Sequence, residues 1–313
     1  MNTLLRPLLS ILFAALVVLA AAPPDAHAQK RIGVILTGDI PYYGAMHERF
    51  IAELGRRTAG GEKIEIILQR PFPNAISWSN AARKLIAFDV DLIVTYGAPA
   101  AQAVIHEKSR IPLVYAGLYE PDQAAVAGKN VTGCGFKVPL SSIIRYFKGF
   151  KAVNTLGIVF SSVEEDSVRQ YETMKELAAQ QGIKAEEIDI RSRVDLDKLK
   201  TKNWDAVFIT GSSLVHLLLE DIMEILRKEK IPTADIFPDF SEAGVVMTLF
   251  QPAHLQGETA AEMATQILLG EKPGNIASHT FRDTELVFNL VAAKHLGITF
   301  PINLLIEATE VIK

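Results

Sequence analysis

The chain has a single cysteine, Cys134, among its 313 residues. One cysteine cannot form an internal disulfide, so the fold must be held together by its hydrophobic core. The sequence also lacks any lysine and arginine cluster dense enough to follow a phosphate backbone, and its net charge is −4. We therefore expect no nucleic-acid partner.

Common enzyme motifs are missing as well. The sequence has no G-x-G-x-x-G, no phosphate loop ending in Gly-Lys-Ser/Thr and no G-x-S-x-G. After residue 28 the histidines lie too far apart in sequence to form a local metal-binding pair. The sequence therefore predicts no cofactor, no metal site and no catalytic residue, although a site assembled from distant residues remains open.

Beyond the N-terminus, no apolar run is long enough to cross a bilayer. At the N-terminus, Arg6 precedes an apolar stretch over residues 8–22, and Ala26-His27-Ala28 has the small-x-small pattern of a cleavage site. Residues 1–28 are thus predicted to be a secretory signal peptide, with an uncleaved membrane anchor as the alternative. We expect a soluble protein exported to a bacterial periplasm.

The remaining chain is long enough for two domains of ordinary size, at roughly 100 to 200 residues each. Short runs rich in valine and isoleucine alternate with amphipathic stretches such as 166–181 and 213–228. This alternation predicts an α/β fold of doubly wound parallel sheets with helices on both faces. The predicted strands are 31–37, 63–69, 91–96, 112–116, 156–161, 184–190, 205–210, 232–236 and 244–250.

The alternation breaks once, between Ala116 and Pro139, where glycines dominate, and we place a flexible lobe boundary there. The stretches 91–97 and 205–211 resemble each other, and each precedes an Ile-Pro pair. This indicates two copies of one lobe. The alternative is that such short sequence motifs are common to all parallel α/β sheets. The predicted domains are 29–136 with 251–281, and 137–250 with 282–313, joined by several hinge crossings. A helix over 255–269 and a strand and helix over 285–297 complete them.

Ligands of open parallel sheets gather at the carboxyl ends of the strands, where loops open. Two such rims facing each other would form a cleft for a small molecule. Tyr42 and Tyr43 are the strongest candidates, because adjacent aromatic residues in a loop often await an apolar partner. The serines and glycines have the alternative role of helix caps and turns. The candidate ligand-binding residues are Asp39, Tyr42, Tyr43, Tyr96, Gly97, Ala98, Tyr119, Glu120, Ser161, Ser162, Glu165, Ser167, Gly211, Ser212 and Asp239.

Several short motifs in this order resemble the periplasmic substrate-binding proteins of ABC importers, within the tryptophan and tyrosine transport family. The resemblance covers nearly all of the chain after residue 28. It is carried most specifically by Asn130-Val-Thr-Gly133 and Leu269-Gly-Glu-Lys-Pro273, with support from Ile32-Gly33-Val34, 91–94, 99–102, Ile111-Pro112, 156–159, 165–167, Gly257 and 293–297. It implies a type I periplasmic binding protein, a clamshell of two lobes with three hinge crossings.

The resemblance also implies roles for single residues. Glu165 and Ser167 would line the cleft, and Glu120 stands where the family has aspartate before proline. Ala98 and Ser212 depart from the family's threonine and aspartate, which would hold the charged ends of an amino acid. A buried, unpaired ammonium group would cost several kcal/mol, unless Glu120, Glu165 or Asp239 replaces the missing acid. We therefore expect a small polar or aromatic ligand without the amino-acid pair of charges.

The function expected from these observations is that of a monomeric periplasmic binding protein. It would close over one small organic ligand and deliver it to an ABC permease, without chemistry of its own. Two alternatives remain at this stage. One is a periplasmic sensory module for a sensor kinase or receptor, and the other is an exported α/β enzyme.

Overall fold

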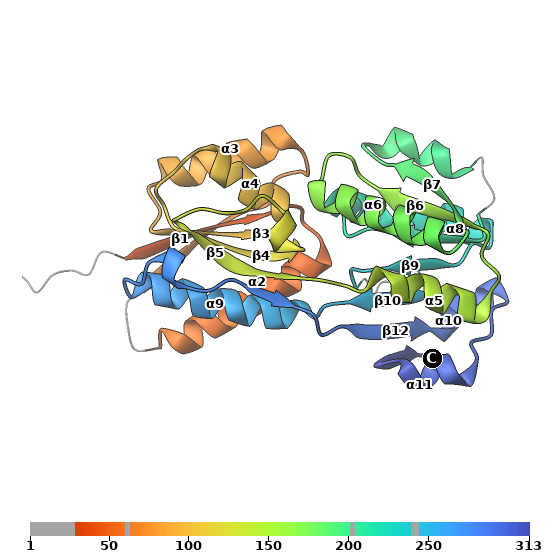
Figure 1. Ribbon diagram of the computed structural model, residues 1–313. Coiled ribbons are helices and arrows are strands. Elements are labelled where there is room, and N and C mark those ends of the chain that lie inside the picture. The colour runs from red at the N-terminus through yellow and green to blue at the C-terminus, as the bar shows by residue number, and fades with distance from the viewer. Residues whose placement is uncertain (1–28, 60–62, 201–203, 239–243) are drawn as a thin grey trace, which may run out of the picture.

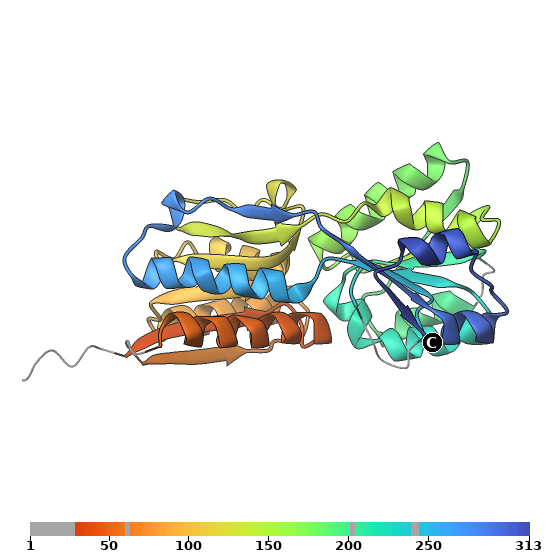
Figure 2. The same cartoon turned by 90° about the horizontal axis from the view of Figure 1, so that it is seen from below.

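The computed structural model describes residues 29–59, 63–200, 204–238 and 244–313. The predicted signal peptide, 1–28, and Asp239 lie outside these ranges. Two α/β lobes stand side by side, each built on one twisted sheet with helices on both faces (Figures 1 and 2). All nine predicted strands are present, and the fold class is confirmed. Among the described residues, no helix is long and apolar enough to cross a membrane.

The first lobe contains a six-stranded sheet in the order β11-β5-β4-β3-β1-β2, with every pair parallel. In β1, Ile32, Val34 and Leu36 face one core cluster and Ile35 faces another, as the two-residue period of a strand requires. Its elements are β1 (Lys30–Leu36), α2 (Pro41–Arg57), β2 (Ile64–Gln69), α3 (Ala75–Ala87), β3 (Leu92–Tyr96), α4 (Ala98–His106), β4 (Leu113–Tyr119), η1 (Pro121–Gln123), β5 (Val131–Phe136), α9 (Ala253–Leu268), η3 (Pro273–Asn275) and β11 (His279–Phe281).

The second lobe has a seven-stranded sheet in the order β13-β12-β10-β9-β8-β6-β7, in which only the β10–β12 pair is antiparallel. The predicted helix over 213–228 is divided at Leu218 into two. The elements are α5 (Leu140–Phe150), β6 (Thr155–Phe160), α6 (Glu165–Gln180), β7 (Lys184–Asp189), η2 (Arg193–Lys200), β8 (Ala206–Ile209), α7 (Ser213–Leu217), α8 (Leu219–Lys228), β9 (Thr233–Asp235), β10 (Met247–Phe250), β12 (Glu285–Asn289), α10 (Leu290–Leu296), α11 (Ile302–Glu307) and β13 (Glu310–Ile312).

The two sheets repeat one topology. Strands β5-β4-β3-β1-β2 of the first lobe correspond in order to β10-β9-β8-β6-β7 of the second. In each lobe a later strand, β11 or β12, then extends the sheet beside the fifth strand. The shared order supports the duplication inferred from the sequence. The chain passes between the sheets after β5, after β10 and after β11. The predicted domain limits, which state which parts of the chain move together as rigid bodies, stay a prediction.

The lobe boundary predicted within the glycine-rich segment lies at its end, where the chain leaves the first sheet after Phe136. Residues 117–136 contain the end of β4 and all of β5, both in the first sheet. The glycines are there because the strands approach closely at an irregularity in β4. A Cβ at Gly133 would overlap the carbonyl oxygen of Tyr115, and one at Gly135 would overlap that of Leu118. Close backbone packing therefore explains Gly133 and Gly135.

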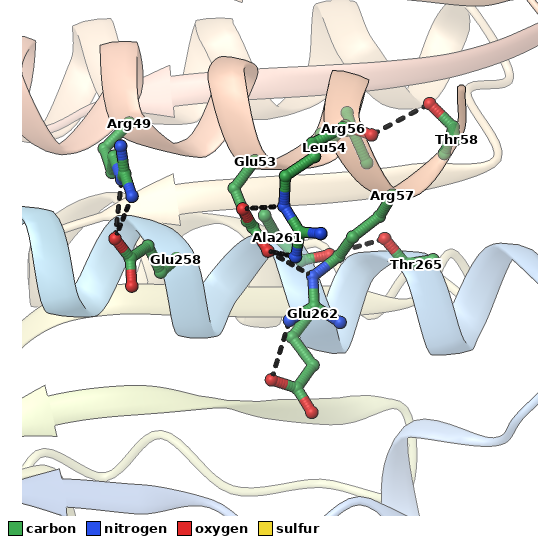
Figure 3. A network of polar contacts seen from close by, with 10 residues as sticks. All are labelled: Arg49, Glu53, Leu54, Arg56, Arg57, Thr58, Glu258, Ala261, Glu262 and Thr265. Carbon is green, nitrogen blue, oxygen red and sulfur yellow. Dashed lines mark hydrogen bonds and ion pairs between the residues drawn. The ribbon is translucent and has the colours of Figure 1, made fainter.

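Helix α9 belongs to the first lobe although it follows most of the second in sequence. It packs along α2, where Gly257 lets the backbones approach, because a Cβ there would overlap the carbonyl oxygen of Met46. Ion pairs flank this contact (Figure 3): Arg49 Nε donates to Glu258 at 2.6 Å and Arg57 Nη2 to Glu262 at 3.2 Å. Packing and charge together fix the returning segment to the first lobe.

Candidate ligand-binding site between the lobes

Tyr42 and Tyr43 lie in the first turn of α2, not in a loop as predicted. Pro41 begins the helix at the position where the fixed φ of proline fits best. Both rings are buried, at 2% exposure each. The sequence pattern suggested exposed rings because one of the residues that cover them, Phe237, comes from the other lobe.

The covering residue is Phe237, which follows β9 in the second lobe. Its ring is stacked on Tyr42, with the ring centroids 4.3 Å apart and an interplanar angle of 20°. Tyr43 and Phe136 of the first lobe lie 5.8 and 6.3 Å from the same ring. We call Tyr42, Tyr43, Phe136 and Phe237 the aromatic cluster. It brings side chains of both lobes into direct contact.

The hydroxyl of Tyr42 is held by the segment that joins the lobes. It donates to the carbonyl oxygen of Gln251 at 3.1 Å and accepts from Gln256 Nε2 at 3.0 Å. Gln256 Oε1 in turn accepts from the Gly117 N–H at 2.8 Å. Burial raises the pKa of Tyr42, so the phenol stays neutral. The ring orientation in the cluster is therefore fixed by a crossing of the chain.

Glu164 supplies a buried carboxylate at the rim of the second lobe. Its oxygens accept from Ser212 Oγ at 2.5 Å and from the N–H groups of Ser213 and Leu214, both at 2.9 Å. Burial raises the pKa of Glu164, and these hydrogen bonds oppose the shift. Ser212 stands where the family pattern has an aspartate. Glu164 thus places a carboxylate beside Ser212 in place of that missing acid.

Asp166 is a second buried carboxylate, in the first turn of α6. Its Oδ2 accepts from the N–H of Tyr119 at 3.3 Å, across the lobe interface. Burial raises the pKa of Asp166 to about 7, although the Arg169 cation and the N–H groups of Tyr119 and Ala98 lower it. The negative charge of Glu164 raises it further. Two acidic groups therefore face one interface.

Near α4 the two lobes bring several hydroxyl groups together. Gly97 has φ +89°, and a Cβ there would lie 2.5 Å from Thr37 Oγ1 and 2.6 Å from the Tyr43 hydroxyl. A Cβ at Gly38 would lie 2.5 Å from the Cβ of Ser213 in the second lobe. Hydroxyl groups of other residues therefore surround the start of α4. Ala98, which replaces the family's threonine, lies at this point.

Most other predicted site residues have partners within their own lobe. Tyr96 points under α2, where its hydroxyl lies 3.3 Å from His47 Nδ1. Asp39 pairs with Arg70, Ser162 with Asp189, and Glu120 with Lys137. Ser167 is hydrogen-bonded to Thr210, and the N–H of Gly211 donates to Gln170. Ser161 Oγ is buried with no partner in the described part of the chain. Glu165 is 60% exposed and contacts Gln102 of the first lobe.

The sequence prediction missed Phe136, Glu164, Asp166, Arg169 and Gln170. A signal was present for the acids, because the run 164–166 precedes a clear helix at the end of a buried strand. Phe136 and Phe237 also end or follow strands, but nothing local shows that they meet. That contact depends on how the lobes are placed.

His216 and Asp235 position Phe237 through a chain of hydrogen bonds within the second lobe. The carbonyl oxygen of Ser212 can only accept, so His216 Nδ1 donates to it at 2.7 Å. His216 Nε2 lies 3.0 Å from Asp235 Oδ2, and Asp235 Oδ1 accepts from the N–H of Phe237 at 2.9 Å. This histidine therefore supports Phe237 through Asp235. Within the described ranges, no group of three or more His, Cys, Asp or Glu is placed to hold a metal ion.

The family model for "ABC transporter substrate binding protein" matches residues 70–312. The chain belongs to this family. Its members are solute-binding proteins, which agrees with a site made by two lobes and with the resemblance seen in the sequence. The family match establishes the type of protein and the binding of small ligands.

Individual relatives are more distant. A curated "Tyrosine-binding protein" from Clostridioides difficile is 20% identical over 285 residues, which cover 88% of this chain and 83% of that protein. A domain from Streptococcus pneumonia solved in complex with L-Trp is 23% identical, with a TM-score of 0.84 over 91% of this chain and 100% of that one. A fructose-binding periplasmic domain of a hybrid two-component system is 14% identical, with a TM-score of 0.62 over 86% and 93% of the two chains. These structures share the fold.

Proposed function

We propose that this protein is the periplasmic binding component of an ABC import system and closes its two lobes over one aromatic amino acid. The observation that carries the proposal is the interface itself, where Tyr42 and Phe237 meet from opposite lobes. A clamshell protein needs its ligand-contacting groups divided between two bodies, so that the ligand favours the closed form. The import partner would be a permease, and the protein would act as a monomer.

The aromatic cluster favours a flat apolar ligand body. Aromatic rings at a lobe interface can stack on a ligand ring placed between or beside them. Such contacts bury large apolar areas and dominate binding free energy in small sites. An aromatic side chain therefore fits this part of the interface.

The buried carboxylates favour a cationic group on the ligand. Closing the lobes removes Glu164 and Asp166 from water, and the only cation paired with them in the described contacts is Arg169. A ligand ammonium near Glu164 would offset part of that desolvation. We expected a ligand without the amino-acid charges because Ser212 cannot pair with an ammonium group as the family's aspartate would. Since the carboxylate of Glu164 would pair with the ammonium group instead, that reason no longer applies.

The names of the relatives point in the same direction, toward tyrosine and tryptophan. Isothermal titration calorimetry with three matched compounds tests the proposal. L-Tryptophan carries both charges, tryptamine lacks the carboxylate and indole-3-propionate lacks the ammonium. We expect saturable 1:1 binding of an aromatic amino acid and much weaker binding of both analogues. Equal binding of indole-3-propionate would contradict the ammonium assignment, and no binding of any aromatic amino acid would contradict the ligand class.

A sensory role is the second candidate, because the fold is shared with a periplasmic domain of a two-component system. The two roles differ in their membrane partner and not in the ligand site. An uptake assay with radiolabelled ligand in a strain deleted for this gene separates them. Lost uptake supports import, and intact uptake with lost transcriptional response supports sensing.

A further inference from the structure

The first two turns of α6 reach from the second lobe to the first. Glu165, Asp166 and Arg169 lie on this part of the helix. Their partners, Gln102 in α4 and Tyr119 at the end of β4, belong to the first lobe. Three neighbouring side chains of one helix thus bridge the interface together.

Tyr119 gives both of its backbone groups to the second lobe. Its N–H donates to Asp166 Oδ2 at 3.3 Å, and its carbonyl oxygen accepts from Arg169 Nη2 at 3.1 Å. Arg169 also pairs with Asp166, which fixes the guanidinium in place. The side chains of Asp166 and Arg169 are only 7% and 16% exposed, so solvent screens these contacts weakly. A strand end is therefore held by a charged pair from the other lobe.

A second bridge lies beside the first. Gln102 Nε2 donates to Glu165 Oε2 across the interface and to the carbonyl oxygen of Ala124 within its own lobe. Glu165 also lies 3.7 Å from Arg169, so the two bridges share one cation. Opening the lobes would break the contacts of α6 with Tyr119 and Gln102 at once.

We propose that Arg169, positioned by Asp166, acts as an interlobe latch that stabilises the closed form by binding the backbone of Tyr119, with Glu165 and Gln102 as a second contact. The latch is a positioning device and does not need to touch the ligand. It extends the proposed function, since a more stable closed form slows ligand release. Its action on the lobes themselves does not depend on which ligand binds.

The test measures the distance between the lobes without ligand. Spin labels at Asn80→Cys in α3 and Glu176→Cys in α6, both exposed, report the distance by double electron-electron resonance. The native Cys134 is buried, which limits its labelling. The variants are Arg169→Ala, Arg169→Lys and Gln102→Ala. The control is Arg193→Ala, which removes an exposed pair with Asp221 inside the second lobe.

We expect the ligand-free protein to populate the closed distance. Arg169→Ala should reduce that population about tenfold, Arg169→Lys and Gln102→Ala less, and Arg193→Ala not at all. Should Arg169→Ala fail to fold, the other two variants decide. No closed population in the ligand-free protein, or one unchanged in the variants, would overturn the latch. Because no ligand is present, either result is independent of the proposed function.

Discussion

The phenol ring of Tyr42 lies on the phenyl ring of Phe237, 4.3 Å between centroids, although the residues are in different lobes. Tyr42 is oriented by Gln251 and Gln256 of the returning segment, and Phe237 by Asp235. Each ring is therefore oriented by hydrogen bonds to groups outside the stacked pair. Preorganised aromatic groups lose little side-chain entropy when they bind.

Removing either ring should weaken ligand binding. Tyr42→Ala or Phe237→Ala should cost about 1 to 3 kcal/mol of binding free energy for an aromatic ligand, as expected for a central aromatic contact. Tyr42→Phe keeps the ring and loses only the hydroxyl contacts, so it should bind nearly as well. Calorimetry on the three variants is the measurement. Normal binding by both alanine variants would mean that the cluster only packs the lobes together.

Glu164 and Glu165 should differ sharply despite being neighbours. Glu164→Gln neutralises the buried carboxylate beside Ser212 and should weaken L-tryptophan binding at least tenfold. Its effect on indole-3-propionate should be small, since that compound has no ammonium. Glu165→Gln, at a position 60% exposed, loses only part of the contact with Gln102 across the interface, so it should weaken binding much less than Glu164→Gln does. Equal losses in the two variants would argue against Glu164 as the ammonium partner.

Closure should depend on pH through Asp166. In the closed form burial raises its pKa to about 7. In the open form we expect a value near the ordinary one, about 4. Closing therefore takes up a proton between these values, so the closed fraction should rise as pH falls from about 7 toward 4 and stay constant above 7.

Glu164 contributes in the same direction, because burial raises its pKa too. Asp166→Asn keeps an acceptor for the Tyr119 N–H and should flatten the pH profile in its upper part. The spin-label distance measured from pH 5 to pH 8 checks this. A closed fraction that increases with pH in the native protein has the opposite sign and would reject the assignment.

Two glycines should respond oppositely to alanine. Gly133→Ala places a Cβ against the Tyr115 backbone and should lower the free energy of unfolding by about 1 to 3 kcal/mol. Gly55, inside α2, has open space around it, so Gly55→Ala should raise that free energy by about 0.5 to 1 kcal/mol. Urea unfolding of the two variants gives both values. A neutral Gly133→Ala would show that the close strand contact is relaxed in solution.

Local patterns in the sequence were sufficient for the fold. Buried parallel strands need continuous apolar runs, so β1, β3 and β8 are visible without any tertiary information. The repeat between the lobes also survives in the order of strands. In the glycine-rich segment, a close approach of backbones and a linker have the same composition, so the sequence places the lobe boundary there but does not show that β5 belongs to the first sheet.

The site was less visible, for a physical reason. Tyr42 and Tyr43 were found because adjacent aromatic residues after a strand are unusual. Tyr96, at the end of its own strand, turned out to point under α2 toward His47. Phe237, Glu164 and Asp166 gain their roles from partners in the other lobe or in a distant loop. Contacts across an interface leave no periodic signal in either segment.

Native mass spectrometry tests the central claim most directly. The protein purified from its periplasmic extract is measured intact, and any released molecule is identified after denaturation. We predict a complex with one molecule of an unaltered aromatic amino acid. Added L-tryptophan should bind at 1:1 stoichiometry, either by displacing that molecule or by increasing the fraction of protein in the complex. The complex should be lost in a Tyr42→Ala/Phe237→Ala variant. A protein that stays ligand-free with every aromatic amino acid, or that returns a chemically altered molecule, would contradict the account.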